Sequence, residues 1–101
     1  MKTSKKIKLI SLDTVIEENM RDPEFARLYA KEQLINAIAK MVYQVRKTTG
    51  LTQAELAEKV STTQPVIARL ERGRDSRVPS LGLLMRIANA TGAKLNIKFV
   101  F

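Results

Sequence analysis

The sequence predicts a mainly α protein: a small bundle of helices around a helix-turn-helix, with a helical extension before it and a β-strand after it. Three observations lead to this fold class. Residues 51–73 carry the start signals and apolar spacing of two short helices joined by a tight turn. Residues 24–49 contain no helix breaker. Residues 94–101 alternate apolar and polar side chains, which is the period of a strand.

The region before the bundle, residues 1–31, is interpreted as a basic arm followed by a helical extension. Lys5–Leu12 alternates weakly, so it is either a short strand or an arm without regular structure. Ser11 or Asp13 can cap a short helix that runs to Met20. The pair Asp22 and Pro23 is a second strong helix start.

From that start to Thr49 the sequence is compatible with one helix or with two, and the pattern leaves this open. An apolar stripe comes first, formed by Phe25, Leu28 and Tyr29. A second stripe follows and is wider than a one-sided surface helix needs; its members are Leu34, Ile35, Ile38, Ala39, Met41, Val42 and Val45. We expect this second part to pack on two sides, as the first helix of a domain that spans residues 32–93.

The helix-turn-helix begins at Thr52, which forms a capping box with Glu55. Leu56, Ala57 and Val60 then share one face, and the small Ala57 lets a second helix cross closely. Ser61 and Thr62 form the turn. Thr63 is the expected cap of the second helix, and Pro65 is tolerated in its first turn.

The second helix has an outward face that suits a duplex major groove. Ile67 and Leu70 point inward, which leaves Gln64, Pro65, Val66, Ala68 and Arg69 on the other side. A glutamine amide matches adenine, and an arginine fork matches guanine. Pro65 and Val66 can touch a thymine methyl. The alternative is a plain helical hairpin with solvated side chains; the agreement of caps, turn and core positions favours the helix-turn-helix.

After Gly73, the loop that carries Arg74 and Arg77 is a candidate for contacts with backbone phosphate or is simply solvated. Ser80 caps a further helix that ends at Gly92. In the predicted strand, one side carries Leu95, Ile97, Phe99 and Phe101. A lone strand needs a partner, which is Lys5–Leu12, its copy in a second subunit, or a bound protein. We favour self-pairing into a homodimer, which fits a palindromic operator with two half-sites.

Charge and composition reduce the number of function classes that fit this sequence. The net charge of +8 is uneven: +4 over 1–8, −3 over 9–32 and +7 over 33–101, so the basic excess lies with the helix-turn-helix. Cysteine and histidine are both absent, which removes disulfides, the commonest metal sites and most nucleophile–base pairs. No apolar run approaches the roughly 20 residues of a membrane span. We expect a cytoplasmic protein that is not an enzyme and has no cofactor or metal.

The segment from Gln53 to Arg72 resembles the helix-turn-helix of the lambdoid phage repressors and the wider XRE family, whose fold is a λ-repressor-like bundle. The resemblance implies that Gln53 contacts phosphate, Gln64 reads a base, and Arg69 reads a base or braces the backbone. Pro65 is a further expected base contact. The residues expected to bind phosphate are Gln53, Thr63, Arg72, Arg74 and Arg77. Two departures stand out: Ser61 replaces the usual turn glycine and must adopt a left-handed conformation, and Pro65 replaces a second glutamine.

The chain also resembles HigA-like antitoxins of type II toxin–antitoxin modules. The resemblance lies in the run from Gln64 to Gly73 and, more weakly, in the start at Asp22–Phe25. It implies a protein that represses its own operon and neutralises a toxin, often an mRNA-cleaving endoribonuclease. The acidic 9–32 segment could face such a toxin, with Phe25, Leu28 and Tyr29 as apolar anchors. The alternative for this stripe is packing on the chain's own core, which we expect for Phe25 and Leu28, while Tyr29 is left open. The alternative for the function is a repressor without a toxin.

Overall fold

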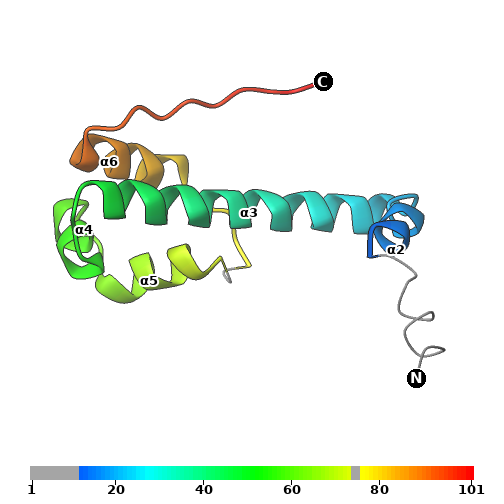
Figure 1. The fold of residues 1–101 in the computed structure, drawn as a ribbon, viewed down its shortest axis with the longest axis horizontal. Coiled ribbons are helices and arrows are strands. Elements are labelled where there is room, and N and C mark those ends of the chain that lie inside the picture. The colour runs from blue at the N-terminus through cyan, green and yellow to red at the C-terminus, as the bar shows by residue number, and fades with distance from the viewer. Residues whose placement is uncertain (1–11, 74–75) are drawn as a thin grey trace. The chain divides into compact units, whose positions relative to one another are not determined.

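The computed structural model describes residues 12–73 and 76–101, and the regular structure in these ranges is helical (Figure 1). The helices are α2 (Leu12–Asn19), α3 (Pro23–Thr48), α4 (Gln53–Lys59), α5 (Gln64–Arg72) and α6 (Leu81–Thr91). The stretch that the sequence left open is therefore one continuous helix, α3. None of these helices is long and apolar enough to cross a membrane.

The chain divides into two compact units, residues 1–32 and 33–101. In the first unit, none of the described residues is buried. Its helices rest on local signals: the Asp22 carboxylate accepts the Glu24 N–H at 3.0 Å, which caps the start of α3. The basic arm and the weakly alternating 5–12 segment lie outside the described residues, except that Leu12 begins α2 rather than ending a strand.

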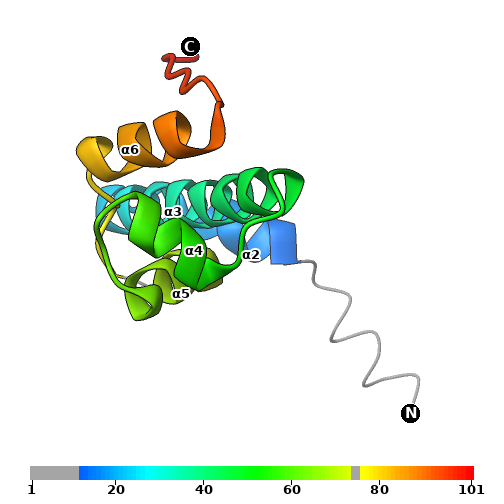
Figure 2. The same ribbon diagram turned by 90° about the vertical axis from the view of Figure 1, so that its left-hand side faces the viewer.

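The second unit contains the core. The part of α3 that belongs to it lies between α5 and α6, which flank it on opposite sides, while α4 closes one end (Figures 1 and 2). This confirms the expectation that α3 packs on two sides. The core cluster draws on all four helices and consists of Ile38, Val42, Leu56, Ala57, Val60, Ile67, Leu70 and Ile87. Leu56 and Ile67 are completely excluded from solvent, so α4 and α5 are held against each other by their apolar faces.

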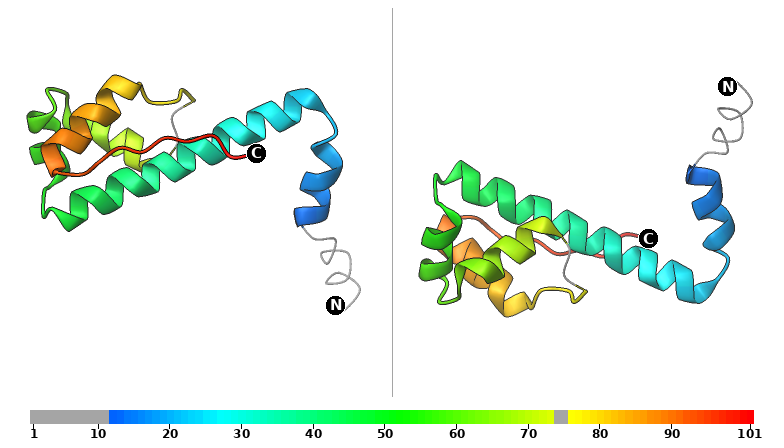
Figure 3. Two further views of the ribbon diagram at one scale, coloured as in Figure 1. Left: turned by 90° about the horizontal axis from the view of Figure 1, so that it is seen from above. Right: turned by 90° about the horizontal axis from the view of Figure 1, so that it is seen from below.

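The predicted C-terminal strand is wrong. Residues 93–101 leave α6 as an extended segment (Figure 3), and no strand occurs among the described residues. Ile97, Phe99 and Phe101 are largely exposed and Leu95 is half-buried. Alternation tells which side chains share a side, but a strand also needs a neighbouring backbone to bond with, and the described residues supply none. The dimer predicted to form by pairing of this strand is therefore also wrong.

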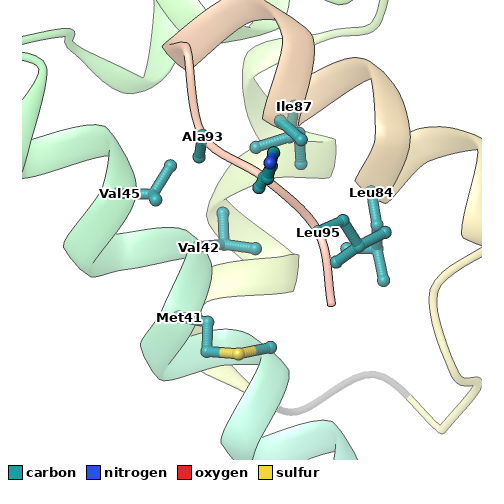
Figure 4. A pocket seen from close by; sticks show the side chains of 9 residues that line it. Met41, Val42, Val45, Leu84, Ile87, Ala93 and Leu95 are labelled. Atoms are coloured by element: carbon teal, nitrogen blue, oxygen red, sulfur yellow. The ribbon is translucent and has the colours of Figure 1, made fainter. Parts of the chain in front are cut away.

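The start of that segment lies over a groove between α3 and α6 (Figure 4). The groove has an accessible volume of about 100 Å³, and Leu95 reaches into it beside Leu84. The rest of its lining is mostly apolar and includes Met41, Val42, Val45 and Ile87, with Lys94 also at the groove. Of the four alternating apolar side chains, Leu95 packs into this groove between helices, and the pattern does not mark a strand of a sheet.

Candidate nucleic-acid interface

The first helix of the motif, α4, starts as the sequence predicts. The Thr52 hydroxyl accepts the Glu55 N–H at 3.0 Å, and the Glu55 carboxylate accepts the Thr52 N–H at 2.8 Å. This capping box satisfies two backbone donors that the first turn leaves without partners. Ala57 is buried in the core cluster that also contains Ile67 and Leu70 of α5, so a larger side chain at this position would overpack the core.

The turn between the two helices depends on one unusual residue. Ser61 has a φ of 60°, the left-handed conformation expected where the related repressors have glycine. Thr63 takes the N-cap position of α5, yet its side chain makes no capping hydrogen bond, so the expected cap is wrong in that respect. Pro65 lies in the first turn of α5, where its missing N–H costs nothing.

The helix α5 divides into two faces. Ile67 and Leu70 are buried, with 0% and 6% exposure. Gln64, Pro65, Arg69 and Arg72 are exposed, and Val66 and Ala68 are half-buried. A helix anchored by one face, with an amide and a guanidinium on the other, has the form of a major-groove reader.

A continuous series of polar contacts lies behind the exposed face. Arg46 and Glu71 form a nearly buried ion pair, with Nε to Oε2 at 2.6 Å and Nη2 to Oε1 at 2.9 Å. The Glu71 Oε1 also accepts from Gln53 Nε2 at 3.1 Å, and Gln53 Oε1 accepts from Gln64 Nε2 at 2.7 Å. The structure therefore links the candidate base reader to a buried charge.

Arg46 and Glu71 were not singled out from the sequence as site residues. The hydrogen bond to Glu71 is the main reason that the pKa of Arg46 lies above its ordinary value. A signal did exist, because Arg46 falls four residues after Val42 in an apolar stripe, where a charge needs a partner. The partner lies 25 residues away, and spacing along a helix cannot identify it.

The structure describes four of the five residues expected to contact phosphate, and they lie on α4, at the two ends of α5 and in the loop after α5. Gln53 lies at the start of α4 and uses one amide N–H for Glu71, which leaves a second N–H that a phosphate could accept. Arg72 and Arg77 are exposed and lie at the end of α5 and in the following loop. Thr63 is exposed at the start of α5, whereas Arg74 lies outside the described residues. No group of acidic residues in the described ranges could hold a metal ion.

Comparison with known proteins agrees with this geometry. A family model described as helix-turn-helix matches residues 42–97, more than half of the chain. The chain belongs to the XRE-type helix-turn-helix family. The match covers α4, α5 and α6 and the last turns of α3, which are the elements that build the candidate interface.

Three relatives extend the comparison. An uncharacterized HTH-type transcriptional regulator of Methanothermobacter thermautotrophicus is 52% identical over 52 residues, which is 52% of this chain and 72% of the relative. A protein of the same description from Archaeoglobus fulgidus is 37% identical over 60 residues, covering 59% and 83%. Human endothelial differentiation-related factor 1 is 39% identical over 61 residues, covering 60% and 40%. No solved structure gives a significant match. Two of the three names describe HTH-type transcriptional regulators, and none of them mentions a toxin.

Proposed function

We propose that the protein is a sequence-specific DNA-binding repressor that acts as a homodimer on a palindromic operator. The observation that carries the proposal is the division of α5, where Gln64 and Arg69 are exposed while Ile67 and Leu70 anchor the opposite face. Gln64, Pro65 and Arg69 would meet base edges. Gln53, Thr63, Arg72, Arg74 and Arg77 would contact phosphate, and phosphate contacts supply most of the affinity.

Dimerisation is proposed because a single short helix reads few base pairs. Two copies of α5 would meet two half-sites about one duplex turn apart, which roughly doubles the readout. Since the C-terminal strand does not form, the contact between the copies must use another surface.

The test is binding to the chain's own promoter. The double substitution Gln64→Ala and Arg69→Ala should weaken specific binding at least about 100-fold, because each bidentate base contact contributes about 1–3 kcal/mol. The matched control, Gln44→Ala with Lys98→Ala, removes an amide and a positive charge from two other exposed positions and should bind normally. Unchanged binding by the first variant would show that α5 is not the reader.

Salt dependence gives a second readout. If a dimer neutralises about eight phosphates, log K should fall against log salt with a slope near −7. A slope shallower than about −2 would contradict the phosphate-contact mechanism.

We also propose a second candidate function, that of a HigA-like antitoxin, which rests on the partly exposed apolar stripe at the start of α3. Leu28 is 52% exposed, whereas Phe25 and Tyr29 are half-buried and their rings stack at 6.0 Å. The expectation that Leu28 packs on the chain's own core is therefore wrong. We propose these three residues as anchors for a basic protein toxin, an mRNA-cleaving endoribonuclease, because residues 9–32 carry a charge of −3.

Co-expression with the adjacent open reading frame tests this function. An antitoxin should rescue a growth-arresting neighbour, and Leu28→Asp with Tyr29→Asp should abolish the rescue. The DNA-reading variant Gln64→Ala should still rescue, because neutralisation does not require operator binding. A harmless neighbour that does not bind this chain would leave a repressor without a toxin.

A further inference from the structure

We propose that Glu71 is a positioning residue for base recognition: its carboxylate fixes which way round the Gln64 amide faces the DNA and so favours adenine over guanine. This proposal rests on the proposed function, in which Gln64 meets a base edge. It goes further by naming the residue that decides which base is preferred, although Glu71 does not itself touch DNA.

The first step is that the Glu71 carboxylate is held rigidly. Arg46 binds both of its oxygens, and the other terminal nitrogen of Arg46 donates to the Leu51 carbonyl at 2.8 Å. The two side chains are only 10% and 5% exposed, so water hardly competes for these bonds. A bidentate guanidinium–carboxylate pair in such surroundings has one strongly preferred geometry.

The second step is that a carboxylate accepts hydrogen bonds and cannot donate them. Gln53 contacts Glu71 Oε1, so Gln53 must turn its amide nitrogen toward that oxygen. The carbonyl oxygen of Gln53 is then directed away from Glu71, where it accepts from Gln64 Nε2. The charge on Glu71 therefore determines the donor and acceptor order of two successive amides.

The third step concerns what Gln64 can still offer. One of its N–H groups is used by Gln53, which leaves its carbonyl oxygen and its second N–H for a base. Adenine presents an N7 acceptor beside an N6 donor, which matches this pair of groups. Guanine presents two acceptors, N7 and O6, and the fixed carbonyl oxygen of Gln64 would face O6 without a hydrogen between them.

Replacing Glu71 with glutamine should remove this constraint. An amide can donate as well as accept, so a nitrogen in the place of Oε1 would let Gln53 turn over and accept from residue 71 while it donates to Gln64. This arrangement gives up the bond from Arg46 Nη2, which also goes to Oε1. Gln64 would then be free to direct both of its N–H groups at guanine. We expect Glu71→Gln to reduce the adenine-over-guanine preference at the base pair read by Gln64 about tenfold, within the range of one bidentate contact.

The control is Arg46→Lys, which perturbs the same ion pair but keeps the carboxylate. A purely structural ion pair predicts that both variants lower the melting temperature and weaken all duplexes in parallel. Our proposal predicts that only Glu71→Gln changes the ratio of the two dissociation constants, measured with operators that differ by adenine or guanine at that position. That base pair is located beforehand as the one at which Gln64→Ala abolishes discrimination.

Spectra of the free protein separate failure of this inference from failure of the proposed function. The side-chain amide NMR signals of Gln53 and Gln64 should shift in Glu71→Gln and stay near their original positions in Arg46→Lys. Unshifted signals in Glu71→Gln, or an unchanged base ratio, would overturn the positioning role. Shifted signals in a protein that binds no duplex would instead refute DNA recognition, and the adenine preference with it.

Discussion

The two halves of α3 have the same backbone conformation and very different surroundings. Residues 23–34 contain no buried side chain, whereas residues 35–46 contribute Ile35, Ile38, Ala39, Val42 and Arg46 to the interior of the second unit. The first half is helical because of an N-cap and the absence of breakers, and the second half is also held by tertiary packing. Helix formation and burial are therefore separate properties, and apolar spacing alone does not distinguish them.

The largest expected effect is the loss of a leucine side chain from the packed core, compared with the loss of one from the exposed first half of α3. Leu56→Ala should lower the free energy of unfolding by about 3 kcal/mol, because it opens a cavity at a fully buried site. Leu28→Ala should change it by less than about 0.5 kcal/mol, since that side chain is 52% exposed. Urea unfolding of both variants checks this. An equal loss at Leu28 would show that the first half of α3 is covered in solution.

Alanine substitutions at two glycines test how closely the buried half of α3 is packed against its neighbours. Gly50 and Gly73 both have positive φ, 73° and 66°, so alanine is strained at either position by about 1 kcal/mol. At Gly73 the new Cβ would also lie 2.8 Å from Asn36 Oδ1 and 3.3 Å from the Ala39 Cβ, whereas at Gly50 it would meet nothing within 4 Å. We expect Gly73→Ala to cost about 2 kcal/mol and Gly50→Ala about half of that. Thermal unfolding gives both values, and equal losses would mean that the α5–α3 approach is looser than described.

The helix caps of the two regions should respond differently. Thr52→Ala removes the capping box of α4 and should cost about 1 kcal/mol of global stability, because α4 is part of the core. Asp22→Ala removes the cap of α3 at an end without buried contacts. It should increase amide hydrogen exchange over residues 23–30 and leave the unfolding midpoint unchanged. A drop in that midpoint would show that the start of α3 unfolds together with the core.

The smallest effect expected is a gain at the turn. Ser61→Gly relieves a left-handed serine and should stabilise the protein by about 0.5 kcal/mol. DNA affinity should not change, because Ser61 lies outside the proposed reading set. A loss of stability would mean that the serine side chain makes a favourable contact that offsets its backbone strain.

Much of the helix-turn-helix could be predicted because its signals are local. The Thr52–Glu55 capping box and the Ser80 cap each join residues three apart, and the structure confirms both. The left-handed conformation of Ser61 was implied instead by the resemblance to the phage repressors, and it is also confirmed. The inward direction of Ile67 and Leu70 follows from helical spacing and is also confirmed.

The predictions that proved wrong are those that required a contact with a distant part of the chain or with a second chain. Ile97, Phe99 and Phe101 alternate as strand residues do, but no neighbouring strand exists for them in the described residues. Leu28 was expected to pack on the core and is exposed. In both cases the sequence shows which side chains share a face and does not show what lies opposite.

By itself the sequence determined where helices begin and turn, and which face of the second motif helix is apolar, because caps, turn residues and helical spacing act over a few positions. Only the tertiary structure decided that α3 is one helix, with a first half that has no buried side chains and a second half that packs into the core. It also brought Arg46, Glu71, Gln53 and Gln64 into one hydrogen-bonded series. Those contacts join residues 11 to 25 positions apart, and such distances are set by the packing of α3, α4 and α5 rather than by any local pattern.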